Sequence, residues 1–350
     1  ILANQVLNSG VGIQELPFDD PVARAEQFVT MRFFFPVSNW LTFYKAYRAT
    51  GDERILEKLR ESARHYNRLS RDFPSVAQLK AKDPEGWAYL YSMAVSSRIT
   101  LQLARKTPDQ VSAKELAEAE EFLTTIAVVL SPALQGNSNL DPQMGIPQAT
   151  ADDFRQRSYN RAMNGIGTLA MATAALEDLQ ALKGGSTYQS TITRYRKAVK
   201  GYMDNFRSIG YFSTAIPGKP IFVYPYNGTH EKIIDGTKIY GRYEDSGHYS
   251  HLLQGLMLVH DATPELGADD EMMTAVANAI HFNNTTKIKR KNREEWSGHI
   301  QCPVSKRVAP QGGENIKRHA FKKGPGSKRF YMLEGFRDGL IDALNTTANE

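Results

Sequence analysis

Apolar residues recur along most of this sequence at steps of three and four, the spacing that places them on one face of an α-helix. A first such run starts at Leu41 and ends at Gly51, and a second begins at Asp52. Ser112, followed three residues later by Glu115, forms a capping box at a helix start. Further helices are predicted over residues 87–103, 112–129, 159–182, 188–206, 245–260, 269–282 and 330–344. The chain is therefore predicted to be all-α.

Short turns rich in Gly and Asp join these helices in pairs, so the chain is a series of helical hairpins rather than a strict sequence repeat. Stacked helical hairpins either extend as a solenoid or close into a ring. Longer irregular stretches are predicted over residues 131–153, 211–242 and 285–328, with a short β-hairpin around Ile221 to Tyr224. With 350 residues, 41% of them hydrophobic, the chain can bury the core of one large domain or of two smaller ones.

The net charge of +5 comes from one C-terminal segment. Between Lys287 and Arg329 there are 13 Lys and Arg residues against three acidic ones, whereas the rest of the chain is mildly acidic. Such a surplus attracts a polyanion, either nucleic acid, an anionic lipid or an acidic polysaccharide. A solvated loop is the alternative interpretation. We expect one domain over residues 1–350 that contains this irregular basic segment, residues 285–329.

Several classes of protein are disfavoured by what the sequence lacks. No window approaches the roughly 18 continuous apolar residues of a membrane span. The single cysteine, Cys302, excludes an internal disulfide and argues against a cysteine-based zinc site. There is no phosphate-binding loop, no dinucleotide fingerprint after a strand, and no Gly-x-Ser-x-Gly motif. We therefore expect no cofactor and no metal, and the start at Ile1 rather than Met indicates a mature or trimmed chain.

The stretch from Gly241 to His251 concentrates chemically active groups where a loop enters a helix. It holds two tyrosines, two histidines, an arginine and two carboxylates, which can move protons and neutralise charge. His248 is expected in the first helical turn, with His251 one turn later. A polar loop with a well-capped helix start is the alternative interpretation. A His-x-x-His pair can also bind a metal, but nothing nearby completes a ligand set, and a structural role is favoured for His251 and His260.

A second motif lies at the start of the helix predicted over residues 159–182. Asn160 and Asn164 are four residues apart and share one face of that helix. Gly165 and Gly167 lie within the helix, where each costs about 1 kcal/mol relative to Ala. Glycine at such positions indicates that another helix or a ligand approaches the backbone closely.

The helical hairpins and the two motifs together resemble the (α/α)-toroid polysaccharide lyases, in particular the alginate and glucuronan lyases of polysaccharide lyase family 38. The motifs are Tyr159-Asn-Arg-Ala-Met-Asn164 and Tyr243-Glu-Asp-Ser-Gly-His-Tyr-Ser-His251. The resemblance covers roughly Leu41 to Asn345 in architecture and these two motifs in detail. The Asn-Asn-His-x-Tyr-Trp motif of other toroid alginate lyases is absent here. The implied fold is an (α/α) toroid or incomplete barrel of helical hairpins with long loops.

The resemblance implies β-elimination on a uronic-acid polymer. The C5 proton of a uronate becomes acidic when the neighbouring carboxylate is neutralised, a base then removes that proton, and an acid protonates the leaving O4 oxygen. On this interpretation Asn164 and Arg242 neutralise the carboxylate. His248 is the base or a further neutralising group, and Tyr243 transfers the proton. The segments near Asn164 and His248 should then meet at a groove flanked by cations.

The implied partner is an anionic polysaccharide, alginate or glucuronan, and we expect neither a nucleic-acid nor a membrane partner. Flat aromatic faces can stack on sugar rings, and the basic C-terminal segment would hold the acidic chain. A secreted or periplasmic location is expected, and the oligomeric state is left open. The expected substrate-binding residues are Arg161, Asn160, Tyr240, Tyr249, His230, Trp296, Lys289 and Arg293.

Two other functions are compatible with the sequence. A glycoside hydrolase on the same helical scaffold would need two carboxylates on opposite sides of the scissile bond. Glu244 and Asp245 are neighbours and cannot both serve, so the second carboxylate would come from Asp152 or Asp153. A non-enzymatic helical repeat protein could instead bind a polyanion through the basic segment, with binding that weakens as salt rises.

Overall fold

The computed structural model describes residues 34–135, 139–213, 218–224, 231–234, 237–240, 246–285, 287–290, 293–296 and 333–342. Side chains are described for residues 41–83, 86–135, 139–212, 218–224, 251–281 and 333–342. Over these ranges the protein is mostly helical, as predicted. No helix among the described residues is both long enough and apolar enough to cross a membrane.

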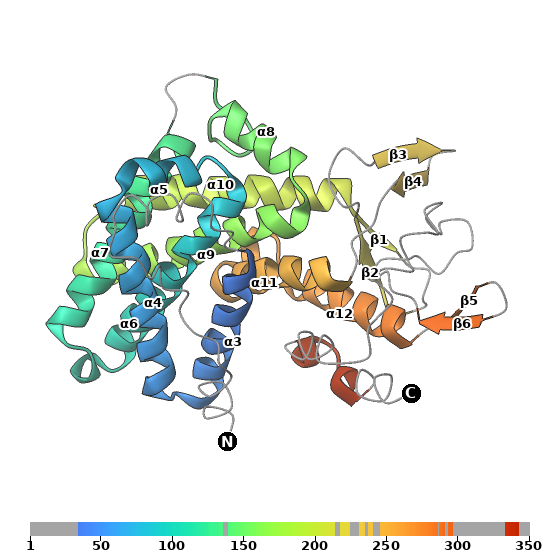
Figure 1. Ribbon diagram of the computed structural model, residues 1–350, viewed down its shortest axis with the longest axis horizontal. Helices are drawn as coiled ribbons and strands as arrows, with labels where there is room; N and C mark the ends of the chain where they lie inside the picture. Colours follow the sequence, from blue (N-terminus) through green and yellow to red (C-terminus); the bar gives the residue numbers. More distant parts are fainter. Residues whose placement is uncertain are drawn as a thin grey trace.

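The helices follow one another along the chain with short connections (Figure 1). In order they are α3 (Phe34–Thr50), α4 (Glu53–Asp72), α5 (Pro74–Lys80), the 3-10 helix η1 (Pro84–Leu90), α6 (Tyr91–Lys106), η2 (Pro108–Gln110), α7 (Ala113–Leu134), α8 (Gln148–Gln156), α9 (Tyr159–Lys183), α10 (Gln189–Ile209), α11 (Ser246–Ala262), η4 (Pro264–Leu266) and α12 (Asp270–Thr285).

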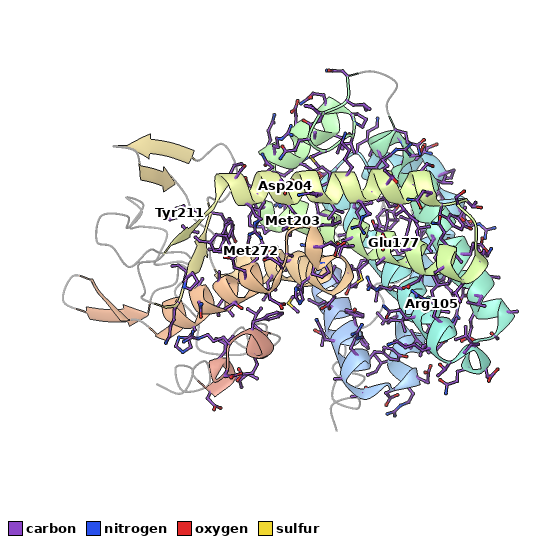
Figure 2. All side chains as sticks on the ribbon, turned by 180° about the vertical axis from the view of Figure 1, so that it is seen from behind. Arg105, Glu177, Met203, Asp204, Tyr211 and Met272 are labelled. Carbon is purple, nitrogen blue, oxygen red and sulfur yellow. The ribbon has the colours of Figure 1, made fainter. Side chains whose placement is uncertain are left out.

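Three antiparallel strand pairs lie at one end of the helical body, where α10 and α12 finish (Figure 1). The expected hairpin around Ile221 is present, and its strands pair Tyr211 with Val223 and Ser213 with Ile221. The pairs are β1 (Tyr211–Ser213) with β2 (Ile221–Val223), β3 (Glu231–Ile234) with β4 (Thr237–Tyr240), and β5 (Lys287–Arg290) with β6 (Arg293–Trp296). Figure 2 shows from behind how Tyr211 of β1 follows directly on α10, the helix that carries Met203 and Asp204.

Helix α9 is the centre of the core. Small and apolar residues occupy every face of α9 itself, so almost every residue from Tyr159 to Leu179 is buried. The helices α6, α10 and α11 and the 3-10 helix η1 pack around it. Neighbouring helices therefore enclose most of α9, and its fully exposed residues, 181–183, lie at its C-terminal end.

Two glycines set the closest approach between α9 and α11. A Cβ atom on Gly255 would lie 2.2 Å from the carbonyl oxygen of Met163, and one on Gly167 would lie 2.8 Å from the carbonyl oxygen of Gly255. Both distances are too short for any residue with a side chain, so only glycine permits the two backbones to come this close. Of the two approaches that Gly167 indicated, a helix or a ligand, the structure shows the helix.

The helix starts predicted from capping residues are confirmed. The Asp52 side chain accepts a hydrogen bond from the backbone N–H of Arg54 at the start of α4. At the start of α7, the Ser112 hydroxyl accepts from the Glu115 N–H at 3.2 Å, and the Glu115 carboxylate accepts from the Ser112 N–H at 2.8 Å. The capping box thus satisfies two backbone donors that would otherwise lack partners.

Replacing Ser112 by Ala is expected to lower the free energy of unfolding by about 1 kcal/mol, because the Glu115 N–H loses its acceptor. Urea denaturation followed by circular dichroism would measure the change. Ser112→Thr is the matched control, since its hydroxyl can cap the same donor and still donate to the Glu115 carboxylate, and it should keep the protein close to the wild-type stability. Equal losses for both variants would contradict the role of the cap.

The stretch predicted to be irregular over residues 131–153 is helical at both ends, so that prediction was wrong there. Helix α7 continues through Pro132 to Leu134, and α8 begins at Gln148. Pro132 has no backbone N–H, so the carbonyl oxygen of Val128 lacks its usual helical donor. The proline is tolerated because Val128 lies on the solvent-exposed side of α7. The intervening turn is fixed by Asp141, which accepts from the backbone N–H of Met144 at 2.7 Å.

The prediction of a last helix over residues 330–344 was also wrong for the part that the structure describes. Residues 333–336 form a 3-10 turn, Gly339 adopts a positive φ of 76°, and only residues 340–342 are helical. The Glu334 carboxylate accepts from the backbone N–H groups of Gly339 and Ile341, which stabilises the turn instead of a continuous helix. Similarly, the helix predicted from residue 87 begins as η1, and α6 starts only at Tyr91.

Candidate functional site

The two motifs singled out from the sequence lie on helices that pack against each other. Met163 of α9 meets Gly255 of α11, and Gly167, one turn later, meets Gly255 and Leu258. The contacts advance in the same direction along both helices, so the N-terminal ends of α9 and α11 lie on the same side of their crossing. The structure therefore brings the segment around Asn164 beside the helix that carries His248.

Buried polar side chains accumulate in the N-terminal halves of these two helices. Asn160 and Asn164 of α9 are 0% and 2% exposed, and His251 and Gln254 of α11 are 4% and 3% exposed. Polar groups are seldom enclosed in this way unless hydrogen bonds or a function compensate for the loss of water. We call these four residues the buried polar group of the α9–α11 pair.

Part of this group is satisfied locally. The Ser158 hydroxyl donates to Asn160 Oδ1 at 2.9 Å, and Asn164 Nδ2 donates to the Asn160 carbonyl oxygen at 2.8 Å. Because Nδ2 carries a second hydrogen, the Asn164 amide can donate to a carboxylate and keep its bond to Asn160. The amide is therefore oriented by the preceding turn of its own helix.

Two oxygens of the group, Asn164 Oδ1 and Gln254 Oε1, have no hydrogen-bond partner among the residues that the structure describes. A buried acceptor without a donor costs about 1–3 kcal/mol, and such groups are often found where a ligand or water completes the network. One of these acceptors lies on each helix of the pair. Sequence reasoning missed Gln254, because a lone Gln in an apolar run carries no distinguishing spacing.

The other predicted site residues fall in three groups. Arg161 of α9 is partly exposed. The side chains of Tyr240, His248, Tyr249, Lys289, Arg293 and Trp296 are not described, although β4, the first turn of α11, β5 and β6 hold these residues. Tyr243, Arg242 and His230 lie outside the described residues. The roles of all these residues stay predictions.

A network of aromatic rings ties the start of α9 to the first strand pair. The Tyr159 ring lies 5.0 Å from that of Phe206 on α10 and 5.9 Å from that of Tyr224, which follows β2. Phe206 also contacts Phe222 at 5.2 Å. Edge-on and tilted ring contacts of this kind are favourable and hold strand β2 against the N-terminal end of α9. Tyr224, like Trp87, Tyr89 and Tyr91, is thus part of the core rather than an open surface for sugars.

The sequence did not predict a basic cluster that lies at the end of α12. His281 of α12 lies near Arg337 of the C-terminal turn and Lys219 of the turn before β2. Burial, together with the positive charges of Arg337 and Lys219, lowers the pKa of His281 to about 4. These three residues are far apart in sequence, so no motif could have revealed them.

Protein stability is expected to fall as the pH decreases from about 6.5 to about 4. In that window the unfolded chain, with an ordinary His pKa of 6.5, binds a proton that His281 in the folded protein does not accept. The stability contributed by neutral His281 is thus complete above pH 6.5 and lost towards pH 4. Urea denaturation of wild type and His281→Gln at several pH values tests this. Parallel pH profiles of the two proteins would contradict it.

No group of three or more His, Cys, Asp or Glu side chains is placed to hold a metal ion within the part of the chain that the structure describes. Buried carboxylates occur at Asp141 and Asp178, and each is paired with an arginine, Arg155 and Arg105 respectively. Neither belongs to the buried polar group. Comparisons with protein-family models, curated proteins and solved structures found no match to this chain.

Proposed function

We propose that this protein is a polysaccharide lyase that cleaves a uronic-acid polymer, alginate or glucuronan, by β-elimination. One observation carries the proposal: the packing of α9 against α11 places Asn160 and Asn164 beside the helix that holds His248 and His251. Amide and imidazole groups on adjacent helix ends are the residue types that carboxylate neutralisation and proton transfer require.

The proposed reaction proceeds in one elimination. The Asn164 amide and the Arg242 guanidinium stabilise the negative charge that develops on the uronate carboxyl group as C5 loses its proton. His248 or Tyr243 takes that proton, and the released electron pair forms the C4–C5 double bond. The bond between C4 and O4 breaks, and Tyr243 protonates O4, with Tyr240, Tyr249 and His230 as the alternative proton donors. The products are two shorter chains. One has a non-reducing end with a double bond, and the other has a new reducing end.

The proposal extends to the arrangement of the helices. Successive helices of similar length form the pairs α3–α4, α6–α7, α9–α10 and α11–α12, each joined by a short connection. We propose that these pairs form an incomplete (α/α) toroid around α9 and α11. On this view β5 and β6, which carry Lys289, Arg293 and Trp296, belong to the segment that holds the acidic chain of a substrate encountered outside the cell or in the periplasm.

The buried polar group favours elimination over hydrolysis. A glycosidase requires two carboxylates across the scissile bond, and the described residues of the buried polar group include none. Asp152, one of the two candidates for a second carboxylate, lies on α8 and accepts a hydrogen bond from Gln148 at 2.8 Å. The Asn164 amide, whose Nδ2 carries a second hydrogen beyond the one bonded to Asn160, is instead suited to donate to the carboxylate of a uronate.

A substrate screen tests the proposal directly. The protein would be incubated with alginate, glucuronan, pectate and glycosaminoglycans, and the ultraviolet absorbance of the new double bond followed over time. We expect absorbance to rise with alginate or glucuronan. New saturated reducing ends without absorbance would indicate a hydrolase, and salt-sensitive binding without any product would indicate a polyanion-binding protein. Either outcome would overturn the lyase assignment.

A further inference from the structure

The C-terminal turn, residues 333–342, is fixed to the helical body on each side of its tip. Before the tip, Arg337 Nη1 donates to Asn278 Oδ1 of α12. After the tip, the side chain of Leu340 is fully buried. Figure 1 shows this turn as the red segment beside α12. A change in the length of the main chain between Arg337 and Leu340 must therefore disturb one of the two attachments.

The two residues between these attachments are Asp338 and Gly339, an aspartate followed by a glycine. Both are exposed to solvent, and Gly339 adopts a positive φ of 76°. A Cβ atom on Gly339 would meet nothing within 4 Å, so no group that the structure describes shields this side of the main chain. Because glycine has no side chain, its backbone nitrogen is the least hindered one that can follow an aspartate. The residue types and the exposure together make this pair chemically reactive.

The reaction open to such a pair is an isomerisation through a cyclic imide. The backbone nitrogen of Gly339 bonds to Cγ of Asp338, the Cγ–O bond breaks, and one water leaves with the proton of that nitrogen. Water then reopens the ring. When it adds at the former backbone carbonyl carbon of Asp338, the chain continues through the side chain as a β-linked isoaspartate, one methylene longer. No oxidant or cofactor takes part, and the mass of the protein is unchanged.

Glu334 holds the nitrogen that would have to attack. Its carboxylate accepts from the Gly339 N–H at 2.7 Å and from the Ile341 N–H at 2.6 Å. To bond to Cγ of Asp338, the Gly339 nitrogen must leave this hydrogen bond and lose its proton. Hydrogen bonds to charged groups are among the stronger ones in proteins. The need to break one slows the reaction by roughly tenfold to a hundredfold.

A second pair in the chain shows why the sequence alone does not locate such a site. Asn164 is followed by Gly165, and these residue types would cyclise at least as readily. However, Asn164 is 2% exposed, and its Nδ2 donates to the carbonyl oxygen of Asn160 within α9. Two further pairs, Asn227-Gly228 and Asp235-Gly236, lie outside the described residues. Because the regular helix keeps the Gly165 nitrogen bonded to the preceding turn, we expect Asn164 to stay unmodified, as an internal reference.

We propose that Asp338 is a site of isoaspartate formation, which Glu334 holds back in the folded protein by binding the backbone N–H of Gly339. The 2.7 Å bond to Glu334 at an exposed Asp-Gly pair carries this inference, which does not depend on the lyase assignment. Once formed, the β-linkage lengthens the main chain between Arg337 and Leu340, so both attachments cannot be kept. The turn then separates from α12.

Accelerated ageing of the full chain tests the site. The protein would be kept at neutral pH and raised temperature for several weeks, in buffer or in guanidinium chloride, and then digested. Mass spectrometry with electron-transfer fragmentation distinguishes aspartate from isoaspartate at residue 338. We expect isoaspartate in guanidinium chloride, and at least about tenfold slower formation in buffer, where the bond to Glu334 is present. Asp338→Glu should give no such product, because the imide ring would be larger and less favoured.

Variants of Glu334 assign the protection to this side chain. Glu334→Ala removes both acceptors and should raise the rate in buffer close to the unfolded rate. Glu334→Gln keeps one acceptor oxygen and should give an intermediate rate. Glu53→Ala removes the same charge from an exposed position at the start of α4 and should age as the wild type does. If Glu334→Ala failed to fold, Glu334→Gln and the two wild-type rates would still decide the question.

Hydrogen exchange measures the consequence for the turn. In the aged fraction that carries isoaspartate, peptides covering residues 333–342 should exchange faster than in the fresh protein. Equal rates of isoaspartate formation for native and unfolded wild type would overturn the inference, as would a Glu334→Ala rate no higher than that of Glu53→Ala. Absence of isoaspartate at residue 338 even in guanidinium chloride would also overturn it. Isoaspartate with unchanged exchange would overturn the release of the turn.

Discussion

Replacing His248 by Ala, or Tyr243 by Phe, is expected to lower the rate of unsaturated-product formation by roughly 10²- to 10⁴-fold. The reason is that each change removes a group that takes up or delivers a proton at the reacting sugar, and water replaces it poorly. The measurement is the initial rate of absorbance increase on the polymer that gives the fastest wild-type reaction.

Tyr188→Phe is a suitable control for the tyrosine change. Its hydroxyl donates to Glu120 on α7, next to the N-terminal end of α10, so its loss affects a peripheral hydrogen bond and not the α9–α11 crossing. Wild-type activity is expected from this variant. Thermal unfolding of every variant by circular dichroism shows that the fold is retained. A His248 or Tyr243 variant that keeps wild-type activity would remove that residue from the mechanism.

Gly255→Ala is expected to destabilise the protein by about 3 kcal/mol, the largest stability effect of any substitution considered for this fold. The added methyl group would lie 2.2 Å from the Met163 carbonyl oxygen, and neighbouring backbone atoms cannot yield as a flexible side chain could. The two helices must separate, which opens gaps along a closely packed contact. Chemical denaturation monitored by tryptophan fluorescence would measure the loss.

Gly335→Ala provides the matched control for Gly255→Ala. A Cβ atom at Gly335 would meet nothing within 4 Å, and its φ is not in the left-handed region. Its stability should therefore stay within about 0.5 kcal/mol of wild type, as for an ordinary surface substitution. If Gly255→Ala were no worse than Gly335→Ala, the close crossing of α9 and α11 would not be required for folding.

The sequence predicted the helices well because their signals are local. Asp52 and Ser112 determine their own helix starts through bonds to residues two or three positions away, and apolar spacing over several turns identifies α9 and α10. The failures also have local causes. Glu334 competes for backbone donors and Gly339 turns the chain, so the apolar spacing of residues 330–344 does not produce a helix.

The candidate site was predictable only in part, since it depends on contacts between distant segments. Gly167 indicated a close neighbour, but nothing in the sequence named Gly255 as that neighbour or Gln254 as a buried acceptor beside it. The cluster of Lys219, His281 and Arg337 depends on the docking of a C-terminal turn whose form was itself predicted wrongly. Residues that meet only through tertiary packing leave no periodic signal.

The enclosure of α9 by its neighbours has a consequence for how the protein exchanges its amide hydrogens. The backbone of residues 162–176 is buried on all sides, so deuterium can reach these amides only when the whole helical body opens. Their exchange rates would therefore report the global free energy of opening. Any ligand that binds the native state alone should slow them by a factor of one plus the ratio of its free concentration to its Kd, which makes mass spectrometry of α9 peptides a label-free assay for unknown ligands.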